Sequence, residues 1–141
     1  MTTTPDIDGQ LKGAVRDAIS LLAEAFSSLD LRIVPDAQGG AWIEIADVPL
    51  GSPYLAESTF VVFLLPFNLP GSDIYPLFVR HDLGRADGAP LGQAFQETDL
   101  AWPGESAVRR VIQVSRRTRG SFASQTAPQK INKVLDWMRA Q

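Results

Sequence analysis

Apolar residues near the N-terminus follow the repeat of an amphipathic helix. Between residues 8 and 29 they recur every three or four positions, so they fall on one helical face. This stripe consists of Leu11, Val15, Ala18, Leu22, Ala25 and Leu29, and Ile19 and Phe26 widen it. The segment Thr4-Pro5-Asp6 provides capping and first-turn residues, and residues 1–7 are expected to be flexible. We therefore predict a helix from Asp8 to Leu29 that packs on a sheet.

A second helix is predicted from Pro128 to Arg139. Thr126 and Gln129 have the spacing of a capping box, in which each side chain accepts a hydrogen bond from the backbone N–H of the other residue. The apolar stripe of this helix consists of Ile131, Val134, Leu135 and Met138.

Four strands are predicted between the helices. They are Leu31–Val34, Trp42–Val48, Phe60–Leu65 and Tyr75–Arg80. The third is continuously apolar, which is typical of a central strand covered on both faces. The connections at residues 35–40, 49–57 and 66–73 are rich in turn residues, which favours an antiparallel meander.

The segment from Leu83 to Ser106 is expected to be irregular, because it contains four glycines and two prolines. Residues 107–115 follow as one more candidate extended segment. The predicted fold class is α+β: an N-terminal helix, a four-stranded antiparallel meander, a long irregular segment and a C-terminal helix. The length of 141 residues fits a single domain spanning residues 1–141.

The composition excludes several kinds of chemistry. The chain has no cysteine, so it can form no disulfide, thiolate nucleophile, thioester or cysteine zinc site. His81 is the only histidine, and we expect no metal and no cofactor. A formal net charge of -3 argues against general binding of nucleic acid or membranes. Because the N-terminus does not resemble a signal peptide and no apolar run could span a bilayer, a cytoplasmic location is expected.

Four short motifs follow one another in a familiar order: Trp42-Ile43-Glu44-Ile45, the strand Phe60–Pro66, Tyr75-Pro76 entering the fourth strand, and Val114-Ser115-Arg116-Arg117-Thr118-Arg119-Gly120. In this order the chain resembles the ubiquitin-conjugating enzyme fold. The closer likeness is to its divergent prokaryotic branch, whose genes lie beside ubiquitin-like proteins in bacterial conjugation operons. That branch carries a Trp-Ser-Arg-type motif near the position of the last segment. The resemblance spans residues 31–139.

The departures from this family concern its chemistry. Active members carry a cysteine after the fourth strand, which accepts the modifier as a thioester, and this chain has none. The His-Pro-Asn tripeptide of the eukaryotic enzymes is also missing, since Asp82 and Leu83 follow His81. The resemblance therefore implies an inactive variant. Such a variant binds a ubiquitin-like protein, or its activating or conjugating enzyme, without a covalent bond.

Two alternatives stay open. The chain could be a conjugating enzyme with a hydroxyl or amine nucleophile, such as Ser115 or Lys130. It could also be a protein-binding adaptor outside ubiquitin-like pathways. His81 could act as a base only beside a nucleophile, and a histidine bonded to backbone or solvent is the more common case.

Five arginines within eleven positions form the strongest local anomaly in this acidic chain: Arg109, Arg110, Arg116, Arg117 and Arg119. Guanidinium groups pair bidentately with carboxylates, so the segment could bind an acidic partner surface or a C-terminal carboxylate. The alternative is a solvated strand edge, where charge discourages aggregation.

Three aromatic residues are further candidates for partner contacts. Phe95 and Trp102 lie in the long irregular segment, and each ring either anchors a partner or packs on the core beneath the loop. Tyr54 lies in a Gly-Ser-Pro-Tyr loop and is expected to be exposed.

Overall fold

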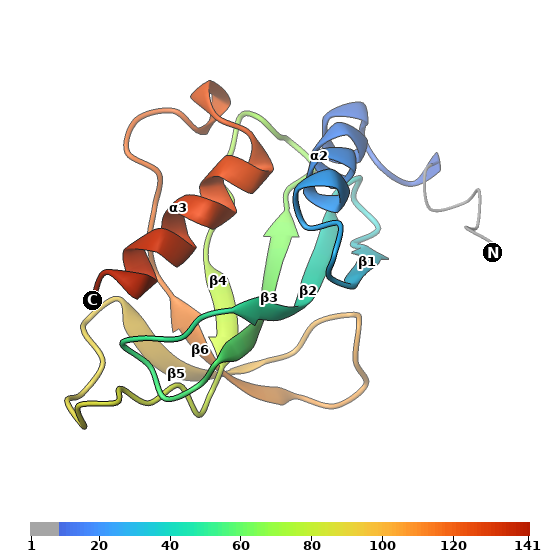
Figure 1. The fold of residues 1–141 in the computed structure, drawn as a ribbon. Coiled ribbons are helices and arrows are strands. Elements are labelled where there is room, and N and C mark those ends of the chain that lie inside the picture. The colour runs from blue at the N-terminus through green and yellow to red at the C-terminus, as the bar shows by residue number, and fades with distance from the viewer. Residues whose placement is uncertain (1–8) are drawn as a thin grey trace.

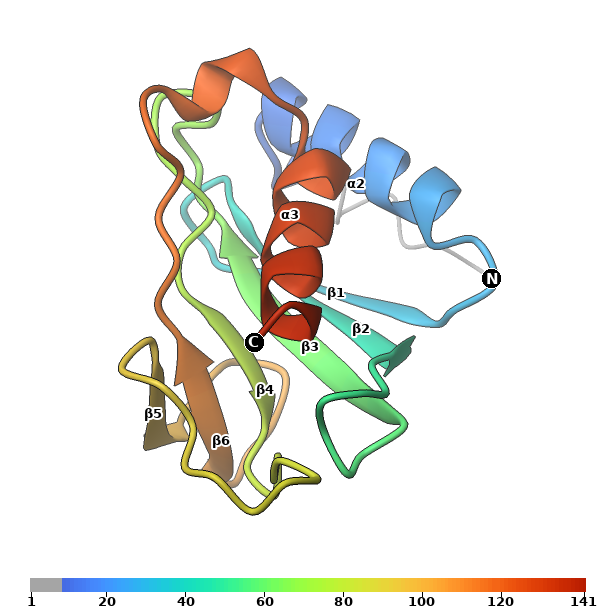
Figure 2. The same ribbon diagram turned by 60° about the vertical axis from the view of Figure 1, so that its left-hand side comes forward.

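The computed structural model describes residues 9–141 and contains one antiparallel sheet with two helices packed on one of its faces (Figures 1 and 2). In chain order the elements are α2 (Gly13–Ala25), β1 (Leu31–Pro35), β2 (Ala41–Pro49), β3 (Ser58–Leu65), β4 (Leu77–Arg80), β5 (Phe95–Leu100), β6 (Arg109–Val114), the 3-10 turn η1 (Phe122–Ser124) and α3 (Ala127–Arg139). The strand order is β1-β2-β3-β4-β6-β5. The predicted α+β class is confirmed.

The sheet has six strands, so the predicted number of four is wrong. Part of the segment expected to be irregular forms β5, which pairs with β6 from Phe95 opposite Val114 to Leu100 opposite Arg109. β6 inserts between β5 and β4. β5 could not be predicted from the sequence, because it is an edge strand with only Leu100 buried. Its polar residues therefore give no apolar pattern.

The two helices match their predictions to different degrees. α3 has the predicted capping box, with Thr126 Oγ1 accepting from the Gln129 N–H and Gln129 Oε1 from the Thr126 N–H, and its predicted apolar stripe is buried. α2 is shorter than predicted, since it begins at Gly13 and ends at Ala25, where the Phe26 backbone leaves the helical region. The predicted start at Asp8, the capping segment 4–6 and the flexibility expected for residues 1–7 lie outside the described residues.

The main core lies between the helices and the sheet. Val61, Phe63 and Leu65 of β3 face the helices and are fully buried. Ile43 and Ile45 of β2 lie beside them, because alternate residues of a strand share a face. The two helices contact each other above this layer.

Within residues 9–141 no helix packs on the opposite face of the sheet, and the β5–β6 connection at residues 101–108 folds over it (Figure 2). Trp102 is 4% exposed and packs in a second apolar cluster with Val62, Phe78 and Val111. Its ring lies 6.1 Å from that of Trp42 on β2. This cluster explains why β3 is apolar at consecutive positions, as predicted for a strand covered on both faces.

No helix within residues 9–141 has the length and apolar character needed to cross a bilayer.

Candidate functional site

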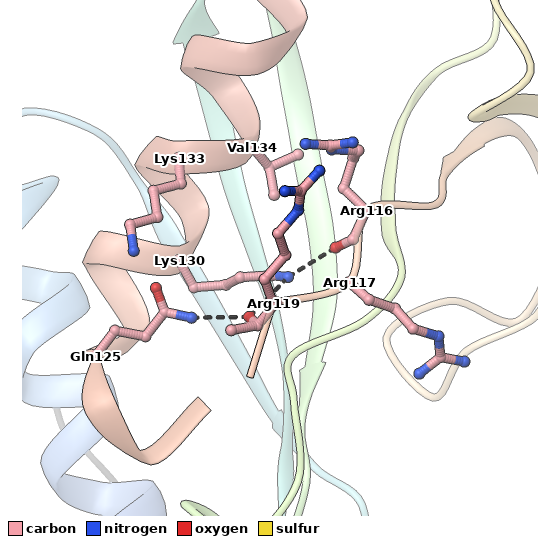
Figure 3. Close-up of a pocket in the computed structure, with 8 residues that line it drawn as sticks. Arg116, Arg117, Arg119, Gln125, Lys130, Lys133 and Val134 are labelled. Atoms are coloured by element: carbon pink, nitrogen blue, oxygen red, sulfur yellow. Dashed lines mark hydrogen bonds between the residues drawn. The ribbon is translucent and has the colours of Figure 1, made fainter. Parts of the chain in front are cut away.

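A pocket of about 250 Å³ lies between the segment that follows β6 and the exposed side of α3 (Figure 3). It is lined by Arg116, Arg117, Thr118, Arg119, Gln125, Lys130, Lys133 and Val134. Five of these eight side chains are cationic. We call this site the cationic pocket.

Lys130 holds in place the backbone segment that lines the cationic pocket. Its side chain is 3% exposed, and its Nζ donates to the Arg116 carbonyl oxygen at 2.7 Å and to Thr118 Oγ1 at 3.2 Å (Figure 3). It also pairs with Asp73 Oδ2 at 3.3 Å, in the loop before β4. These bonds join α3 to residues 116–118, so the arginines project from a backbone that is already positioned.

Asp73 and Thr118 complete this framework. The Asp73 carboxylate accepts hydrogen bonds from the Thr118 N–H at 2.7 Å and from the Thr118 hydroxyl at 2.8 Å. Burial raises the pKa of Asp73, but the two bonds from Thr118 and the ammonium of Lys130 outweigh it and leave the pKa lowered. Burial lowers the pKa of Lys130, and Asp73 offsets only part of that effect. The framework is a buried ion pair that serves to position a charged segment.

The remaining cations of the pocket have no carboxylate partner among residues 9–141. Within residues 9–141 no ion pair joins Asp or Glu to Arg116, Arg117, Arg119 or Lys133. The Arg116 guanidinium lies 4.5 Å above the Trp137 ring, and that of Arg117 lies 3.9 Å from the centre of the Tyr75 ring. Like charges gathered in one hollow repel one another and attract anions from solution. The pocket is therefore suited to bind an anion.

The structure divides the five predicted arginines into two groups. Arg116, Arg117 and Arg119 line the pocket. Arg109 bonds Glu44 at 2.7 Å and Glu105 at 2.8 Å, which ties the β5–β6 connection to β2. Arg110 pairs across the hairpin with Glu97 and Asp99 of the edge strand β5, each at 3.2 Å. Arg109 and Arg110 are thus already paired and lie outside the pocket.

The three predicted aromatic contacts have packing roles. Trp102 is buried, as described above, and Phe95 stacks on Trp137 with ring centres 5.4 Å apart. The expectation that Tyr54 is exposed is wrong, because the residue is 4% exposed and its hydroxyl donates to the Met138 carbonyl oxygen at 2.8 Å. The loop holding Tyr54 folds inward, since its backbone also pairs with Arg85 in the segment after β4. Trp102 and Tyr54 are buried, whereas Phe95 is only partly buried.

The sheet does not bring His81 beside Ser115, and Lys130 is bonded inside the fold. Leu77 pairs with Val114 and Arg80 with Val111, so His81 and Ser115 leave opposite ends of the β4–β6 pair. Lys130 is buried with three oxygen acceptors around its Nζ. Within residues 9–141 no three His, Cys, Asp or Glu side chains gather as metal ligands.

His81 lies beside a tight ion pair that bounds a second hollow, at the end of β4. Arg80 donates to both oxygens of Asp82, one at 2.7 Å, and this lowers the pKa of Asp82 to about 2.

We predict that Arg80→Gln raises the Asp82 pKa toward its ordinary 3.8, as measured by NMR titration of the carboxyl carbon. Because the folded pKa is the lower one, the stabilisation by Asp82 is present above pH 3.8 and is lost as the pH falls toward 2.

Asp87 is the matched control for this titration, since Arg85 binds it in the same bidentate way. Arg80→Gln should leave the titration of Asp87 unchanged. A pKa of Asp82 that stays near 2 in the variant would contradict the prediction.

Comparison with known proteins gives no relative of this chain. No model of a protein family, no curated protein and no solved structure matches it. The resemblance to ubiquitin-conjugating enzymes stays a hypothesis that these comparisons neither support nor contradict.

The sequence did not link Lys130, Lys133, Gln125 or Asp73 to the arginines, although Lys130 left a signal. Lys130 lies on the apolar stripe of α3, three residues after Ala127 and four before Val134, both of which are buried. A lysine at such a position is rarely fully buried unless its charge is paired. Lys133, Gln125 and Asp73 left no comparable signal, because nothing in their spacing links them to the arginines.

Proposed function

We propose that the protein is a non-catalytic binding protein that holds an acidic partner protein at the cationic pocket. The observation that carries this proposal is the gathering of Arg116, Arg117, Arg119 and Lys133 around one hollow, where no carboxylate of the described residues pairs with them. A net charge of -3 makes this concentration exceptional for the chain. Since the chain also lacks cysteine, its means of acting on the partner is surface complementarity.

We propose further that the partner belongs to a bacterial ubiquitin-like conjugation pathway. It would be the ubiquitin-like protein or its activating or conjugating enzyme, bound by an inactive relative of the conjugating enzymes. Three features support this. Along the chain, the strands of the antiparallel sheet lie between an N-terminal and a C-terminal helix. Tyr75-Pro76 directly precedes β4, and the Arg116–Arg119 motif lies at the pocket. No measurable binding, in calorimetry, to any such protein encoded beside its gene would refute this partner class.

Arg119→Gln is predicted to weaken partner binding about threefold to tenfold and to reduce its salt dependence. The Arg119 side chain lines the pocket and has no acidic partner within the described chain, so its full charge is available to the ligand. Isothermal titration calorimetry at two ionic strengths measures both effects.

Arg110→Gln removes the same charge from an arginine outside the pocket and is the matched control. Its effect on affinity should be below twofold, because Glu97 and Asp99 already neutralise Arg110. Equal losses in the two variants would show that net charge, and not the pocket, determines binding.

A further inference from the structure

The orientation of the Gln125 amide in the cationic pocket is determined by its neighbours. The Thr118 hydroxyl donates its single hydrogen to Asp73, so its oxygen can only accept further bonds. It accepts from Lys130 Nζ at 3.2 Å and from Gln125 Nε2 at 2.8 Å. The amide nitrogen of Gln125 must therefore face Thr118, and its oxygen must face the other way.

Gln125 Oε1 consequently lacks a hydrogen-bond donor. In Figure 3 it points away from the bond to Thr118, on the side of the pocket lined by Lys133. The atom is buried, and no donor within the described chain bonds it. Buried acceptors without a donor are uncommon and call for an explanation, and a ligand with a hydrogen-bond donor would satisfy this one.

A ligand that satisfies the pocket needs two groups close together. Its anionic group would meet the guanidinium and ammonium groups of Arg116, Arg119 and Lys133, and its N–H or O–H would donate to Gln125 Oε1. The volume of about 250 Å³ is below the usual range for drug-sized molecules, so the bound part is small. A metal cation is excluded by the charge of the lining.

We propose that the cationic pocket binds the carboxyl terminus of a polypeptide. The terminal carboxylate pairs with the arginines and Lys133, and the N–H of the last peptide bond donates to Gln125 Oε1. A peptide end carries both groups within one residue, whereas an ionised phosphate monoester offers only acceptors. Val134 supplies an apolar wall for the last side chain. This inference rests on the proposed function and specifies which part of the partner is held.

Acetyl-tetraalanine peptides test the inference by NMR titration of the wild-type chain at pH 8. The free acid should bind about tenfold more tightly than the C-terminal amide, because only the acid offers a charge to the guanidinium groups. Methylation of the last peptide nitrogen should weaken binding of the free acid about threefold. In Gln125→Met that loss should disappear, since the acceptor has been removed. This ratio of two affinities does not depend on how stable the variant is.

Three results would overturn the inference: equal binding of acid and amide, a methylation effect that persists in Gln125→Met, or phenyl phosphate or oligothymidylate binding more tightly than the free acid. Failure here can be distinguished from failure of the proposed function. If a whole acidic partner binds in an Arg119-dependent way and still binds after residues are added to its C-terminus, this inference fails alone. If the free-acid peptide binds but no acidic protein does, the proposed function fails.

Discussion

Replacing Trp102 by alanine is expected to lower the free energy of unfolding by about 3–5 kcal/mol, in the range of large aromatic truncations in a core. Trp102 is 4% exposed and covers the helix-free face of the sheet. Its ring packs against Trp42, the Arg32 guanidinium lies 5.0 Å from its centre, and its indole N–H donates to Glu105 at 3.1 Å. Loss of the ring would expose that face and release the β5–β6 connection. Urea denaturation monitored by circular dichroism measures the change.

Val108→Ala is the matched control, because Val108 lies in the same connection and is 60% exposed. Its effect should stay within about 0.5 kcal/mol. Truncation of Trp102 should leave the affinity for a pocket ligand unchanged once both variants are folded. A Trp102→Ala protein that is as stable as the wild type but binds its partner poorly would restore the interpretation of Trp102 as a partner anchor.

Gly104 supports the same packing. A Cβ atom added at Gly104 would overlap the Trp102 ring, so the chain needs glycine at this position for the ring to close over the sheet. In the sequence analysis, Gly104 was one of the four glycines that favoured an irregular segment. Composition alone could not show that the connection is held by a buried tryptophan, because the contact joins residues 60 positions apart, Trp102 and Trp42.

The elements that could be predicted are those whose pattern is local. α3 combines a capping box with an apolar repeat, and both signals lie within fourteen residues, from Thr126 to Arg139. Residues 60–65 of β3 are apolar without interruption because both faces of the strand are covered. β5 has neither signal, and its pairing with β6 is decided by contacts across a hairpin. Edge strands are polar on their exposed sides, which makes them resemble loops in a sequence.

The candidate site was predictable only in part, for a related reason. The arginines were visible as a cluster in sequence, yet the fold separates Arg109 and Arg110 on β6 from Arg116, Arg117 and Arg119 at the pocket. The acidic partners of Arg109 include Glu44, which is 65 residues away. Which arginine is neutralised depends on such distant contacts. Which arginines at the pocket stay unpaired can therefore be identified only from the ion pairs that the described residues form in the fold.

Lys130→Met is expected to lower the free energy of unfolding by about 3 kcal/mol, near the lower limit for breaking a buried ion pair. The ammonium holds Asp73, the Arg116 carbonyl oxygen and Thr118, and methionine can replace none of these bonds. Removing the ammonium also removes the free-energy cost of burying its charge, so the loss of stability in Lys130→Met is smaller than the broken bonds alone would give. Asp73 keeps its two bonds from Thr118 and is 17% exposed, so the carboxylate left behind is partly stabilised.

Two further variants separate this framework from the binding surface. Lys133→Met removes an exposed charge from the same helix and pocket, so it should change stability by no more than about 0.5 kcal/mol while it weakens anion binding. Combining Lys130→Met with Asp73→Asn should cost less than the sum of the two single changes, since no unpaired carboxylate stays behind. Additive costs in urea denaturation would mean that Lys130 and Asp73 do not act as a pair. The cationic segment would then have to be positioned by Thr118 and Gln125 alone, and loss of Lys130 would leave peptide binding intact.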